Sequence, residues 1–180
     1  MSLDVVAMKR HLITWAKTYS GISESGRHIW AFQNSPQPSS PYVTLNITSG
    51  PTKIGNTDAL MYNESNQTYD ITGIRSFKVD INVFGSNAHN TATALSLSLE
   101  RPEVQSFFRG VNITPYGSTP SVNNVTRFID TIYEERSMFE LTLSASYLIE
   151  TSESFIGEVS AAGASEMEKG HGNKITIGGI

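Results

Sequence analysis

The histidines are the first residues to consider for metal or acid–base chemistry. They are His11, His28, His89 and His171, and none stands at a ligand spacing such as HExxH. His11 falls near the apolar edge of an expected helix. We therefore interpret these side chains as packed or surface histidines, and the sequence predicts no metal site.

Motifs for nucleophilic catalysis and phosphate binding are absent. The chain contains no GxSxG, no Walker A loop and no GxGxxG after a strand. The glycine clusters at 170–172 and 177–179 lack the strand–turn–helix context of a phosphate cradle. The chain also has no Cys, which excludes disulfides, thiol catalysis and Cys-based zinc sites. No cofactor is predicted.

Paired carboxylates could divide the roles of general acid and base. Glu134 and Glu135 are adjacent on an expected strand, so we expect them to point to opposite faces, with Arg136 as a possible ion partner. The remaining candidates do not form a convergent set: Asp58, Asp70, Asp80 and Asp130. The sequence therefore predicts no catalytic residues and a protein that is not an enzyme.

Tyrosines are the other side chains that could form a binding face. They are spread along expected strands and loops: Tyr42, Tyr62, Tyr69, Tyr116 and Tyr133. A sugar-binding surface, core packing and contact with another protein would each account for them.

The composition limits the classes of partner. The 180 residues carry a net charge of −4, and only 17% are charged. Sequence-independent DNA binding needs many Lys and Arg to release counterions, so a dedicated nucleic-acid binder is excluded, although a neutral wall around passing DNA is not. No signal peptide and no run of about 18 apolar residues is present, which predicts no membrane association and a protein made in a cytoplasm.

The first half of the chain reads as a helix followed by strands. An apolar stripe predicts a helix over Asp4–Tyr19, capped by Ser2 or Asp4. A short strand over His28–Phe32 and a proline-rich loop over Asn34–Pro41 follow. Alternation predicts a strand over Tyr42–Thr48, which Gly50-Pro51 should end. The polar stretch Lys53–Asp70 suggests a hairpin arm.

The second half alternates helix and strand again. A strand over Ser76–Phe84 leads into a helix over Ala88–Arg101, and Pro102 should start another helical segment that Gly110 ends. Three further strands are expected: Val111–Tyr116, Val125–Glu135 and Met138–Ile149. The last two form either a tight hairpin or one long bent strand. Phe155–Val159 could add an edge strand.

These elements predict an α+β fold. A mainly antiparallel sheet should pack against two or so α-helices, with a long polar arm and a flexible C-terminal tail. Residues 1–160 should form a single domain, and the Gly-rich residues 161–180 should form the tail.

Three stretches together resemble the tail terminator (neck) proteins of tailed bacteriophages. They are the strand Pro41–Ile47 after the leading helix and proline-rich loop, the strand Phe77–Gly85 with its following helix, and Ile132–Leu141 continuing to Ile149. The likeness spans roughly residues 4–160. It implies a structural virion protein without a cofactor, which forms a ring, commonly of six copies. Such a ring caps the tail tube and contacts the head connector, with DNA passing through its lumen.

Other functions remain open at this point. A related neck or tail component, such as a head-completion adaptor or a tail tube protein, would have similar composition. A monomeric β-rich binding module would instead show a discrete aromatic cleft. The resemblance places the protein in the virion neck, assembled in the cytoplasm of a bacterial host, with the tube protein and the connector as partners.

Overall fold

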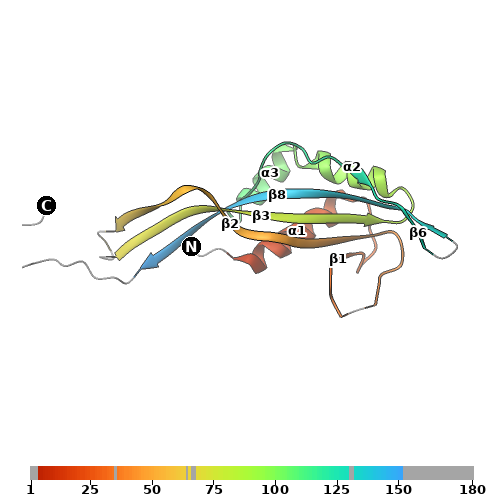
Figure 1. The fold of residues 1–180 in the computed structure, drawn as a ribbon, viewed down its shortest axis with the longest axis horizontal. Coiled ribbons are helices and arrows are strands. Elements are labelled where there is room, and N and C mark those ends of the chain that lie inside the picture. The colour runs from red at the N-terminus through yellow and green to blue at the C-terminus, as the bar shows by residue number, and fades with distance from the viewer. Residues whose placement is uncertain (1–3, 35, 64, 66–67, 130–131, 152–180) are drawn as a thin grey trace, which may run out of the picture.

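The computed structural model describes residues 4–34, 36–63, 65, 68–129 and 132–151. Three helices and a mainly antiparallel sheet make up this part of the chain, which confirms the predicted α+β class (Figure 1). The expected edge strand Phe155–Val159 and the expected tail lie outside the described residues. No helix in the described ranges is long and apolar enough to cross a membrane.

The helices begin and end close to the predicted residues. They are α1 (Val5–Tyr19), α2 (Ala88–Ser98) and α3 (Pro102–Arg109). The side chain of Asp4 caps α1 by accepting a 2.9 Å hydrogen bond from the backbone N–H of Ala7. Pro102 starts α3 because a proline at the first helical position loses no hydrogen bond.

The main sheet has the order β1-β2-β3-β8-β4, with β5 also paired to β8. The strands are β1 (His28–Trp30), β2 (Tyr42–Asn63), β3 (Thr68–Phe84), β4 (Ile113–Pro115), β5 (Asn123–Asn124) and β8 (Arg136–Thr151). Only the β1–β2 pair is parallel; the other pairs of this sheet are antiparallel.

One face of the sheet, the helix-side face, carries the core. The alternate residues Phe77, Val79, Ile81 and Val83 of β3 are buried with Phe139, Leu141 and Leu143 of β8. They belong to one apolar cluster that includes side chains of all three helices, so the helices cover the same face. The opposite side, the open face, carries the intervening polar residues of these strands.

Strand β2 is longer than predicted. Gly50-Pro51 does not end it, because register shifts between Ile47 and Thr52 absorb the irregular residues and pairing resumes at Thr52 opposite Ser76. Gly50 is needed there: its φ is +123°, and a side chain would collide with Phe77. The predicted break is therefore a bulge, and β3 correspondingly starts at Thr68 instead of Ser76.

The expected single strand over 125–135 is wrong. It forms a separate hairpin of β6 (Arg127–Ile129) and β7 (Ile132–Glu134), which pair with each other and not with the main sheet. Only Glu135 separates β7 from β8. Neither of the two predicted connections describes the chain: β7 continues toward β8, but β6, which belongs to the same predicted strand, runs antiparallel to β7.

Candidate functional site

The sheet extends past the helices as a three-stranded arm (Figure 1). We define the arm as residues 53–63 of β2, 68–75 of β3 and 146–151 of β8. The predicted hairpin is thus present, with β8 as a third strand. At about 3.4 Å per residue, the arm strand of β3 is roughly 25 Å long.

The arm is less polar than its sequence suggested. Five large apolar side chains on it are between 46% and 62% exposed: Leu60, Met61, Tyr62, Ile74 and Ile149. Cross-strand register places Leu60, Ile71 and Ile149 in one row on the helix-side face, and Ile74 and Met61 on the open face. Apolar surface on both faces of a projecting ribbon indicates a protein–protein contact site.

A charged cluster anchors the arm at its base. Arg75 donates two hydrogen bonds of 3.0 Å to the two carboxylate oxygens of Asp58, and a third of 2.6 Å to the hydroxyl oxygen of Tyr147. Lys53 lies 3.5 Å from the same carboxylate. The hydrogen bonds from Arg75 hold the pKa of Asp58 well below its usual value of 3.8. The cluster ties all three arm strands together where the helices stop.

Gly73 makes room for this cluster, because a Cβ at this position would overlap Oδ1 of Asp58 and the ring of Tyr147. We expect Gly73→Ala to separate Asp58 from Arg75 and to raise hydrogen exchange of the arm amides about tenfold or more, leaving the core amides unchanged. Thr72→Ala is the matched control, because Thr72 pairs with Ala59 on the opposite face. Equal exchange in the two variants would contradict this role.

The hairpin β6–β7 projects from the other end of the molecule (Figure 1). Phe128 and Tyr133 are cross-strand partners with ring centroids 5.0 Å apart. Their side chains are 60% and 76% exposed. Arg127 and Glu134 pair beside them at 3.1 Å. Two aromatic rings on a small exposed hairpin form a second candidate contact site.

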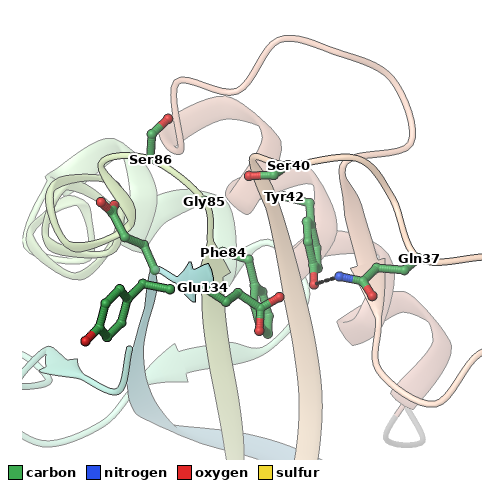
Figure 2. A pocket seen from close by; sticks show the side chains of 9 residues that line it. Gln37, Ser40, Tyr42, Phe84, Gly85, Ser86 and Glu134 are labelled. Atoms are coloured by element: carbon green, nitrogen blue, oxygen red, sulfur yellow. Dashed lines mark hydrogen bonds between the residues drawn. The ribbon is translucent and has the colours of Figure 1, made fainter. Parts of the chain in front are cut away.

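A pocket of about 460 Å³ lies between this hairpin and the end of the main sheet (Figure 2). The rings of Tyr42 and Phe84 stack in it, with centroids 4.6 Å apart. Gln37 donates a 2.7 Å hydrogen bond to the hydroxyl of Tyr42. Burial raises the pKa of Tyr42. The pocket is shaped by aromatic and polar side chains that could contact a peptide segment of another protein.

The structure changes the interpretation of the paired carboxylates. Glu134 and Glu135 both line this pocket, because the chain bends between β7 and β8 and the alternation of a straight strand fails there. Each of the two carboxylates already accepts a hydrogen bond. Glu134 accepts a hydrogen bond from Arg127, and Glu135 accepts one of 3.0 Å from the backbone N–H of Asn87. These hydrogen bonds indicate that the two carboxylates stabilise the local structure and do not act as an acid–base pair.

The other candidates for chemistry are dispersed. The ring of His11 packs at a tilt against Phe107, with centroids 4.9 Å apart, His28 contacts Ser20 and His89 is the second residue of α2; His171 lies outside the described residues. No group of three His, Asp or Glu side chains within the described ranges could hold a metal. Asp58 and Asp70 are on the arm, Asp80 is on the open face and Asp130 is not described. The tyrosines are also dispersed: Tyr62 and Tyr69 lie on the arm, Tyr42 and Tyr133 line the pocket at the opposite end, and Tyr116 follows β4, so these five form no single cleft.

His28 should make stability depend on pH. Burial lowers its pKa below 6.5, and Lys17 lowers it further. The unfolded chain therefore binds the proton first as the pH falls, so stability should decrease below pH 6.5 by at most about 1.4 kcal/mol per pH unit. Urea midpoints at pH 7.5 and 5.5 would measure this. His28→Gln should reduce the difference between the urea midpoints at the two pH values. His89→Gln, which changes an exposed histidine, should keep that difference. An equal difference in both variants would exclude His28 as the cause.

The comparisons with known proteins identify a family for this chain. Residues 8–166 match the family model described as phage neck terminator protein. No curated protein matches the sequence significantly. A solved structure is similar over 78% of this chain and 91% of its own length, with 11% identity and a TM-score of 0.39. Because the family model covers most of the sequence, the chain belongs to the phage neck terminator protein family.

Proposed function

We propose that the protein forms a closed ring at the phage neck that caps the tail tube and joins it to the head connector. The family is structural and belongs to the virion neck, where it associates with other phage head or tail components. A ring, here of six copies, requires each subunit to provide the surfaces that join it to its neighbours. Assembly in the cytoplasm of the bacterial host is part of the same proposal.

The observation that carries the proposal is the presence of two different candidate contact sites at opposite ends of one chain. The arm exposes Leu60, Met61 and Ile149, and the hairpin exposes Phe128 and Tyr133. A head-to-tail ring needs two such unlike surfaces on each subunit, and it closes when the rotation between neighbours suits. A monomeric binding module would need one cleft instead.

The open face of the sheet has the charge properties expected of a channel wall beside passing DNA. Lys78 pairs with Glu140 at 2.7 Å, and Arg136 donates hydrogen bonds to Asn82. Burial and the nearby Glu140 raise the pKa of Asp80 on the same face. Few cations are available there to hold phosphates, so DNA could pass without strong binding.

Light scattering over a range of concentrations, with negative-stain images of the same samples, tests the proposal. Closed rings that do not stack are expected. Long tubes would indicate a tail tube protein instead. If the protein stays monomeric, purified tail tubes supply the template, and failure to bind and cap their ends would overturn the proposal.

A further inference from the structure

The arm ends in an uncompensated acidic pair. Asp70 and Glu150 are directly opposite each other on the open face, where like charges destabilise a strand pair. Asn63 donates a 3.1 Å hydrogen bond to Oδ2 of Asp70, but Oδ1 is buried without a partner. Neither carboxylate forms an ion pair with any residue that the structure describes. The exposed Met61 lies beside them.

Helix α1 carries a surface of complementary charge. Val6, Arg10, Ile13 and Lys17 follow the spacing of one helical stripe, and Lys9 lies next to it. The helix contains no acidic residue, and none of its cations forms an ion pair within the described part of the chain. Val6 is 65% exposed, so the stripe combines positive charge with apolar surface.

These two surfaces do not meet within one chain. Asp70 and Glu150 point to the open face of the sheet, whereas α1 covers the helix-side face. The arm also extends away from the helices (Figure 1). We propose that the acidic tip of the arm docks onto the α1 stripe of a second copy of this chain. This inference rests on the proposed ring and names one of its contacts.

Charge and chemistry favour a second copy over the other partners. Passing DNA would repel the two carboxylates, while every copy supplies the matching cations of Arg10 and Lys17. Met61 would meet the exposed side chain of Val6, which gives the contact an apolar centre with charges around it. The arm of each subunit would contact α1 of one neighbour, and its own α1 would bind the arm of the other neighbour. Such a heterologous contact repeats around a ring.

Charge exchange between the two surfaces tests the contact. We expect Asp70→Asn with Glu150→Lys to raise the concentration for half assembly about tenfold or more, and Arg10→Glu with Lys17→Glu to do the same. An equimolar mixture of the two variants should assemble again, because every contact then joins opposite charges. Assembly of the single variants at the wild-type concentration would overturn the proposal.

Matched controls separate the contact from general effects. Glu103→Lys and Arg109→Glu change exposed charges on α3 and should leave assembly unchanged. Circular dichroism and the thermal midpoint should show that all variants fold as the wild type does. If the arm variant forms rings but no longer binds purified tail tubes, the arm contacts the tube, and the proposal is overturned.

A cross-linking experiment distinguishes failure of this contact from failure of the ring. The chain has no Cys, so Glu150→Cys with Lys17→Cys introduces the only thiols. A bis-maleimide, whose reach exceeds that of a disulfide, should produce a ladder beyond dimers. Glu150→Cys with Asn90→Cys, on an exposed part of α2, should not. A ladder of cross-linked species without rings would support the contact and contradict the proposed ring. Rings without a ladder would support the ring and contradict the contact.

Discussion

Replacing Trp15 with alanine is expected to lower the free energy of unfolding by about 3–5 kcal/mol. The side chain is 1% exposed, its ring centroid lies 5.9 Å from that of Phe108, and its Nε1–H donates a 2.9 Å hydrogen bond to Ser98. The truncation would therefore open a cavity among all three helices. Because a domain of this size is stable by only about 5–15 kcal/mol, urea unfolding followed by circular dichroism should show a large shift.

Two substitutions sharpen this experiment. Trp15→Phe keeps most of the apolar surface but removes the hydrogen bond to Ser98, so we expect a smaller loss of about 1–3 kcal/mol. Leu97→Ala changes an exposed residue of the neighbouring helix and should cost about 0.5 kcal/mol or less. A Trp15→Ala variant as stable as the Leu97→Ala variant would mean that α1 is not docked as described.

The same residue shows how far the sequence could predict the fold. The 3–4 spacing of Met8, Leu12 and Trp15 predicted both the helix and its buried face, because helical periodicity is a local property. The partner of Trp15 was not predictable. Ser98 is 83 positions away, and its pairing depends on how α1 and α2 cross above the sheet.

The arm was predicted only in outline. A Gly-Pro pair normally ends a strand, but the bulge around Gly50 lets β2 continue, which no local pattern reveals. Simple alternation also fails on the arm because both of its faces carry apolar residues. The cluster of Asp58, Arg75 and Tyr147 is not predictable from the sequence for a different reason: it forms through a register shift between Ile54 and Ala59.

The sequence does not predict the aromatic hairpin, because the pattern of residues 125–135 is that of one strand. The residue type of Tyr133 fits core packing and contact with another protein equally well. Only the observed pairing of β6 with β7 shows that its ring is exposed beside that of Phe128. Sequence patterns identify residues that avoid water. They do not show whether the chain itself or another molecule covers those residues.

Replacing both Phe128 and Tyr133 with serine is expected to separate folding from assembly. Both side chains are exposed, so the change should cost about 1 kcal/mol or less in stability. Aromatic anchors at the centre of an interface contribute about 2 kcal/mol or more, so the concentration for half assembly should rise about 30-fold or more. Light scattering and negative-stain images of the folded variant would measure this.

The exposed Tyr116→Ser provides the control, because Tyr116 lies outside both the arm and the hairpin. It removes a comparably exposed ring and should leave assembly unchanged. If the hairpin variant assembles as the control does, the hairpin is not a subunit contact, and its rings are then free to meet the tail tube or the connector. Loss of tube capping in a variant that still forms rings would assign the hairpin to that axial contact, because a ring contact and an axial contact must use different surfaces of the same subunit.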